Sequence, residues 1–120
     1  MYFGRGRRSY YKPAANFLRS KQVKRDPVAK SNKWSVTFEA PAEIKAEEFA
    51  VVGDFNDWDA AEGQMKRRKD GIWARTIRLS PGAYRFRYVA DGGVWYNDPA
   101  ADYYEPSGFG QDNSVVTLMQ

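Results

Sequence analysis

Four acidic side chains gather in one short stretch of the sequence. Paired carboxylates at such density are what glycoside hydrolysis uses, but that reaction also needs a cleft deeper than a loop on a small domain provides. The spacing departs from that of a calcium-binding loop as well, because Trp58 stands where an oxygen ligand is needed. We therefore interpret the four as solvated loop acids that accept hydrogen bonds, with a catalytic or metal role as the less favoured alternative. They are Asp54, Asp57, Asp59 and Glu62.

Histidine and cysteine are absent from the 120-residue sequence. The chain therefore lacks the commonest general base and metal ligand, and it cannot build a thiolate nucleophile or a cysteine zinc site. No apolar run approaches the ~20 residues of a membrane span, and the basic N-terminus has no hydrophobic stretch behind it. We expect a cytoplasmic protein that is not an enzyme, holds no cofactor or metal and does not contact membranes.

Two tryptophans, Trp58 and Trp95, stand in polar loop sequences. An exposed indole offers a flat apolar face that suits the C–H face of a pyranose ring, while nearby polar groups can hold the hydroxyl rim. The alternative is that each indole folds back over the end of the core. The polar neighbours are Asn56 and Asp57 for the first tryptophan, and Asn97 and Asp98 for the second.

The elements that must position these side chains read as β-strands. Residues 34–39, 84–91 and 113–119 alternate apolar and polar side chains, and residues 49–52 form an apolar run typical of a strand covered on both faces. Asp70-Gly71 predicts a hairpin turn. The pattern indicates an all-β sandwich of about seven strands. The side chains expected in or near its core are Trp34, Phe38, Val51, Phe55, Trp73, Leu79, Phe86 and Val116.

Charge divides the chain into two parts. Residues 1–33 hold ten basic residues and one acid, whereas residues 34–120 hold nine basic and fourteen acidic residues. This asymmetry predicts a basic, flexible N-terminal arm, residues 1–33, attached to a sandwich formed by residues 34–120. Aromatic and basic residues interleave in residues 2–11, so we expect weak, non-specific polyanion binding by the arm, such as to nucleic acid. A merely solubilising tail is the alternative.

A series of short motifs lies between residues 51 and 116, within a match that covers roughly residues 34 to 118. Together and in this order they closely resemble the family 48 carbohydrate-binding modules, the early-set domains at the N-terminus of isoamylases and glycogen branching enzymes and in the beta subunit of AMP-activated protein kinase. The resemblance implies an immunoglobulin-like early-set β-sandwich that is an accessory to catalysis. The motifs are Val51-Val52-Gly53-Asp54-Phe55-Asn56-Asp57-Trp58, Asp70-Gly71-Ile72-Trp73, Leu79-Ser80-Pro81-Gly82, residues 84–92, Trp95, Asp98-Pro99 and Asn113-Ser114-Val115-Val116.

The resemblance also implies an α-1,4-glucan ligand, such as glycogen, starch or a maltooligosaccharide, and five residues that contact it. Trp58 and Trp95 would be stacking platforms. Arg87 and Asn113 would hydrogen-bond sugar hydroxyls. Phe109 stands where the kinase-subunit domains have a leucine that reaches under or through the glucan.

Three departures from the kinase-subunit pattern affect this site. That pattern has lysine in place of Arg87, and this chain has one residue more before Trp95, which is expected to tilt or displace the second platform. Gln111 also occupies a position that is usually threonine in that pattern. Some copies of the domain have lost ligand binding. The alternative to a glucan-binding module is therefore an orphan early-set module that binds a protein partner, such as a glycogen-metabolising enzyme, without binding sugar. The two differ in whether Trp58 and Trp95 are exposed on the same side.

Overall fold

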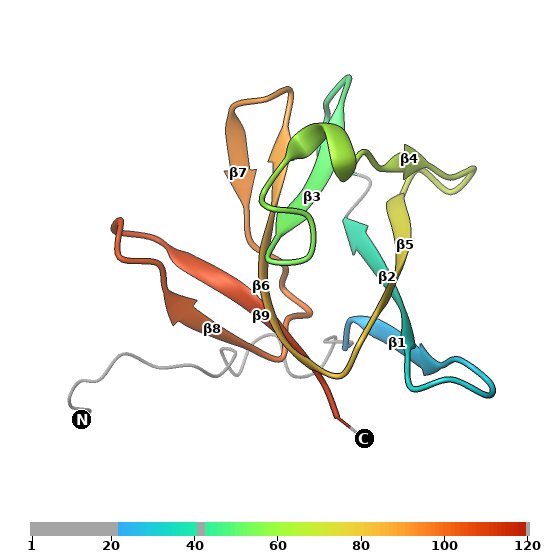
Figure 1. Ribbon diagram of the computed structural model, residues 1–120. Helices are drawn as coiled ribbons and strands as arrows, with labels where there is room; N and C mark the ends of the chain where they lie inside the picture. The colour runs from blue at the N-terminus through green and yellow to red at the C-terminus, as the bar shows by residue number, and fades with distance from the viewer. Residues whose placement is uncertain (1–21, 41–42, 120) are drawn as a thin grey trace.

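Two antiparallel sheets face each other in the part of the chain that the computed structural model describes, residues 22–40 and 43–119 (Figure 1). One has the order β1 (Lys24–Pro27), β2 (Trp34–Ala40), β5 (Trp73–Leu79), β4 (Lys66–Arg67). The other has the order β3 (Phe49–Gly53), β6 (Gly82–Ala90), β9 (Asp112–Leu118), β8 (Tyr103–Pro106), with β7 (Val94–Tyr96) pairing β6. A 3-10 turn, η1 (Ala60–Glu62), follows β3.

The predicted all-β sandwich is confirmed, with nine strands in the described residues where about seven were expected. The two shortest strands, β4 and β7, have two and three residues, too few to show an alternating pattern. No helix within residues 22–40 and 43–119 is long and apolar enough to cross a membrane.

The core lies between the two sheets and is rich in aromatic rings. Phe38 on β2 meets Phe86 on β6 with 4.9 Å between ring centroids, and it meets Phe55 at 5.2 Å. Phe49 stacks on Tyr88 at 5.6 Å. Six of the eight expected core side chains are buried, and Trp34 and Phe55 pack against them half-buried.

The predicted boundary at residue 33 is wrong, because residues before it belong to the sandwich. Strand β1 pairs with β2, with Lys24 opposite Thr37 and Pro27 opposite Trp34. Val23 is buried in the core. Sequence patterning missed β1 because the segment is charged and lacks apolar alternation. The arm's remaining residues, 1–21, lie outside the described residues, so its flexibility and polyanion binding stay predictions.

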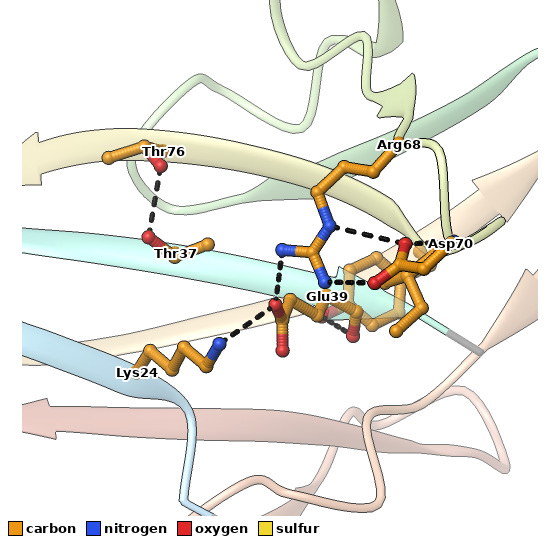
Figure 2. Close-up of polar contacts among 8 residues, drawn as sticks. Lys24, Thr37, Glu39, Arg68, Asp70 and Thr76 are labelled. Carbon is orange, nitrogen blue, oxygen red and sulfur yellow. Dashed lines mark hydrogen bonds and ion pairs between the residues drawn. The ribbon is translucent and has the colours of Figure 1, made fainter. Parts of the chain in front are cut away.

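The outer face of the β1-β2-β5-β4 sheet carries polar side chains that pair with one another (Figure 2). Glu39 accepts from Lys24 at 3.2 Å and from Arg68 at 2.7 Å, and Arg68 also bonds Asp70. Burial opposes ionisation of Glu39, but the hydrogen bonds from Arg68 and Lys24 outweigh it and lower its pKa. These groups satisfy one another across three strands and the adjoining turn, so their charges are matched within the protein.

Candidate functional site

The loop after β3 is shaped by its own polar residues. Asn56 receives a hydrogen bond from the Gly53 amide and donates one to the Val51 carbonyl, both at 3.0 Å. Asp57 and Trp58 are both in the left-handed region, with φ of 57° and 58°. A Cβ on Gly53 would collide with the carbonyl oxygen of Arg85, so only glycine fits there. These bonds turn the chain back over the sheet it has just left.

The indole of Trp58 lies on the outer face of the β3-β6-β9-β8 sheet. It packs against Ala50, Val52 and Val89, a small apolar cluster on that face, and it is half-buried. This explains why β3 reads as a strand covered on both faces. The structure therefore lies between the two sequence-based alternatives, because the indole folds back but covers the outside of the sheet and not the core.

Strand pairing aligns the other predicted residues on this same outer face. Arg87 on β6 lies opposite Val52 on β3. Arg85 on β6 pairs with Val115 on β9, and the two strands are antiparallel. Two residues onward in β6 and two residues back in β9, Arg87 and Asn113 therefore lie next to each other. Trp95 on β7 lies opposite Val89 on β6.

The guanidinium group of Arg87 lies between the two indoles. Its central carbon is 6.0 Å from the centre of the Trp58 ring and 4.9 Å from that of Trp95. Its Nη1 donates to the Gln111 side-chain oxygen at 2.8 Å, whereas its buried Nε has no partner in the described residues. Burial lowers the pKa of Arg87. No carboxylate within the described ranges forms an ion pair with it, so the aromatic rings and Gln111 hold it in place.

An open hollow of about 270 Å³ joins most of these residues. Asn113 is 7 % exposed, and its buried Oδ1 has no hydrogen-bond partner in the part of the chain described. Native proteins leave few buried polar atoms unpaired, so an unpaired donor and an unpaired acceptor beside one hollow point to a polar ligand. The hollow is lined by Asp54, Trp58, Arg85, Arg87, Ser107, Phe109 and Asn113.

Trp95 and Phe109 are the most exposed rings of this face. Trp95 is 44 % exposed and Phe109 is 89 % exposed. Phe109 stands between Gly108 and Gly110, both in the left-handed region, at φ of 89° and 88°. This backbone conformation suits glycine and holds the phenylalanine at the tip of the β8–β9 loop.

The polar neighbours expected to hold a sugar rim beside Trp95 have other partners. Asp98 is 2 % exposed and accepts a 2.7 Å hydrogen bond from the Tyr88 hydroxyl. Burial, and then the Asp98 charge, raise the pKa of Tyr88 well above its usual value. Asn97 bonds Ser114 and the Asp112 carbonyl. Both residues therefore hold the segment after β7 against β6 and β9. Asp98 is buried, so its expected contact with a sugar rim is wrong, whereas Asn97 is exposed and its contact with a sugar stays a prediction.

Two of the four loop carboxylates, Asp54 and Asp59, accept hydrogen bonds, as the sequence indicated. Asp59 caps η1 by accepting from the Ala61 amide at 2.9 Å. Asp54 accepts from the Arg85 amide at 2.8 Å. Within the described ranges no three acidic side chains group as metal ligands would.

Sequence reasoning missed three residues that complete this face, Asp54, Arg85 and Ser107, and it noted Gln111 only as a departure from the family pattern. Arg85 carries a usable signal, because it stands two residues before Arg87 on one strand and so shares its face. The sequence predicts Asp54 as a solvated acid, because the pattern of a single strand does not show that its partner, Arg85, lies 31 positions away.

The chain is similar over most of its length to known carbohydrate-binding domains. Residues 27–104 match the family described as carbohydrate-binding module 48 (isoamylase N-terminal domain). The chain is 33% identical over 73 residues to Protein FLOURY ENDOSPERM 6, chloroplastic, of Oryza sativa subsp. japonica, covering 61% of this chain and 13% of that protein. It is 24% identical over 105 residues to Protein PTST homolog 2, chloroplastic, of Arabidopsis thaliana, covering 88% of this chain and 19% of that protein.

A further relative is the 1,4-alpha-glucan branching enzyme GlgB of Butyrivibrio fibrisolvens, 47% identical over 60 residues, or 46% of this chain and 9% of the enzyme. The chain thus spans less than a fifth of the length of each of these three relatives. The family match, by contrast, runs through both sheets, from the end of β1 into β8. With this extent of match and an all-β sandwich fold, the chain belongs to the carbohydrate-binding module 48 family.

Proposed function

We propose that this chain binds α-1,4-glucan without converting it, on the outer face of the β3-β6-β9-β8 sheet. The observation that carries the proposal is the shared hollow, in which Trp58, Arg87, Phe109 and Asn113 meet although they come from four separate segments. Arg87 connects this hollow to Trp95 through their 4.9 Å contact. Family membership supports a carbohydrate ligand, and the branching enzymes among the relatives bear an α-glucan in their names.

The ligand contacts divide into apolar and polar ones. Glucose rings stack on Trp95 and Trp58, and Phe109 covers the chain from the β8–β9 loop. Arg87 donates to hydroxyls and Asn113 accepts from them; their unpaired Nε and Oδ1 are buried, so a side-chain shift on binding opens these atoms to the ligand. A stacked ring contributes about 1–3 kcal/mol, taking base–aromatic stacking as the analogue. One platform alone would give millimolar affinity or weaker, because 1 mM needs about 4 kcal/mol. Useful binding therefore needs both platforms and the hydrogen bonds.

The second candidate is a protein-interaction module without sugar binding, with a glycogen-metabolising enzyme as partner. One observation favours it: Trp95 and Phe109 are 44 % and 89 % exposed on the same face, and exposed apolar side chains on one face are typical of protein interfaces. The unpaired Nε and Oδ1 favour a hydroxyl-rich ligand over this alternative. A cytoplasmic location stays a prediction; two of the relatives are chloroplastic by name.

Retardation of the protein in native gels containing glycogen separates the two candidates. We expect wild-type protein to be retarded, and the double variant Trp95→Ala/Phe109→Ala to migrate as in a gel without glycogen. Both side chains are exposed, so this variant should keep the wild-type melting temperature. Equal migration of wild type with and without glycogen would contradict glucan binding. Release of reducing sugar from glycogen by wild type, lost in Asp54→Asn, would contradict a non-catalytic role.

A further inference from the structure

Asp54 bridges the loop that carries Trp58 and the strand that carries Arg87. Its Oδ1 accepts from the Trp58 indole Nε1 at 3.4 Å, and its Oδ2 accepts from the Arg85 amide at 2.8 Å and from Arg85 Nε at 3.2 Å. Its own amide donates to the Arg85 carbonyl at 2.9 Å, which extends the β3–β6 ladder by one residue. Both carboxylate oxygens are therefore engaged by protein donors.

We propose that Asp54 is a positioning residue that fixes the ring of Trp58 for glucan stacking and does not itself contact the sugar. This inference rests on the proposed function, since it assigns a role within the same site. A ring in the Trp58 position can rotate about its side-chain torsions. Backbone bonds to the Gly53 carbonyl hold only the main chain. Within residues 22–40 and 43–119, the bond from Nε1 to Asp54 is the one hydrogen bond of the indole itself, and it selects one ring orientation.

The orientation matters because a sugar must lie on a defined face. The Trp58 ring has Ala50, Val52 and Val89 beneath it and the Arg87 guanidinium 6.0 Å from its centre. A flipped ring would move its N–H away from Asp54 and change the surface that lies beside Arg87. Asp54 is itself held by Arg85, which shares the outer face of β6 with Arg87. The ring of Trp58 is therefore fixed relative to Arg87 through Asp54 and Arg85.

The charge of Asp54 fits this role better than sugar contact. Arg85 neutralises it through the 3.2 Å ion pair. Three donors occupy its two oxygens, which leaves limited accepting capacity for hydroxyls. Asp57, three residues on, offers a matched comparison: it is exposed, and no hydrogen bond or ion pair of its side chain is found in the described residues.

A double-mutant cycle between Asp54 and the Trp58 N–H tests the inference. Trp58→Phe keeps an aromatic face but has no N–H. Asp54→Ala should weaken maltoheptaose binding several-fold in the wild-type background and less than twofold in the Trp58→Phe background. Equal weakening in both backgrounds would mean that Asp54 contacts the sugar directly and would overturn the proposal. Glu62→Gln, which removes one charge at an exposed side chain of the following 3-10 turn, should leave affinity unchanged.

A second measurement needs no sugar. In the ¹H–¹⁵N spectrum, the Trp58 indole N–H peak, assigned by its loss in Trp58→Phe, should move upfield in Asp54→Ala and stay in place in Asp57→Asn. An unmoved peak in Asp54→Ala would overturn the proposal. Asp54→Asn repeats both tests with a smaller change if the alanine variant does not fold. If wild-type protein bound no maltoheptaose or glycogen, the proposed function would fail, while the indole peak would still report whether Asp54 holds the ring.

Discussion

The guanidinium carbon of Arg87 lies 4.9 Å from the centre of the Trp95 ring, on the side of the sandwich away from the core. A cation this close to an indole face is attracted by the ring, and the attraction strengthens where water is partly excluded. The same group lies 6.0 Å from Trp58 and bonds Gln111. Arg87 therefore links both platforms to the β8–β9 loop. The extra residue before Trp95 does not separate that tryptophan from the rest of the site.

Replacing Arg87 should reveal how much the planar shape of its guanidinium group contributes to glucan affinity. Arg87→Ala should weaken maltoheptaose binding about tenfold or more, which corresponds to about 1.4 kcal/mol. Arg87→Lys keeps the charge but loses the flat face and the fixed fork of donors, so an intermediate loss is expected. Isothermal titration calorimetry measures both. Arg78 is an exposed arginine on the other sheet, so Arg78→Ala should leave affinity unchanged. Wild-type affinity for maltoheptaose in Arg87→Ala would contradict the assignment.

Substitutions of the tryptophans should distinguish side chains that bind glucan from side chains that stabilise the fold. Trp95→Ala should weaken glucan binding about tenfold, as expected for loss of a stacked ring, with the melting temperature kept because the side chain is 44 % exposed. Trp73→Ala should destabilise the fold by about 3–5 kcal/mol, because it removes a core side chain.

Trp58→Ala should fall between these two. It should lose binding as Trp95→Ala does, and some stability too, since it uncovers Ala50, Val52 and Val89. Thermal melts followed by circular dichroism, with affinity measured in parallel, test all three. Destabilisation by Trp58→Ala as large as that by Trp73→Ala would make Trp58 a core residue and would remove one platform from the proposed site.

Strand alternation predicted much of this fold because strands such as β2 have one face that is more buried than the other. In β2, Val36 and Phe38 are buried and the residues between them are not, and the sequence shows that pattern directly. The five site residues could be named from the family resemblance. That they lie together follows from pairing of β6 with β3, β7 and β9, which a single sequence does not display.

The features that sequence reasoning missed depend on partners far along the chain. β1 is a charged segment in which Arg25 faces inward to Asp102, 77 positions away. Asn97 and Asp98 sit beside an exposed tryptophan but bond into β6 and β9. A polar residue next to a ligand platform in sequence can thus point into the protein, and only the tertiary contact decides which occurs.

Removing residues 1–33 should destabilise the sandwich, because the deletion takes away β1. The remaining sheet would lose the partner of β2, the buried Val23 and the inward-facing Arg25. We expect a lower melting temperature and an all-β circular dichroism spectrum. A chain starting at residue 34 that melted like the full chain would show that β1 contributes little and would restore the boundary predicted from charge.

The ion pair between Arg25 and Asp102 should be a principal source of pH-dependent stability. Two nitrogens of Arg25 bond the two oxygens of Asp102 at 2.9 Å each, and Thr117 donates its amide and hydroxyl to the same carboxylate. Burial opposes ionisation of Asp102, but the hydrogen bonds from Arg25 and Thr117 outweigh it and lower its pKa. Asp102→Asn should therefore cost about 3 kcal/mol at neutral pH, as for other pairs largely removed from water.

The sign of the pH effect follows from the lowered pKa. An unfolded Asp ionises at about pH 3.9, so the contribution of Asp102 is fully present above that pH. It is lost as the pH falls further, through the lowered pKa of the folded state. The stability difference between wild type and Asp102→Asn, measured by urea unfolding, should thus stay constant from pH 7 to about pH 5 and shrink below pH 4.

Lys24→Ala is the matched control, because it breaks an ion pair of β1 whose lysine is 56% exposed. It should cost no more than about 1 kcal/mol. An equal cost for the two variants, or a difference independent of pH, would mean that the carboxylate of Asp102 does not hold β1 to the second sheet.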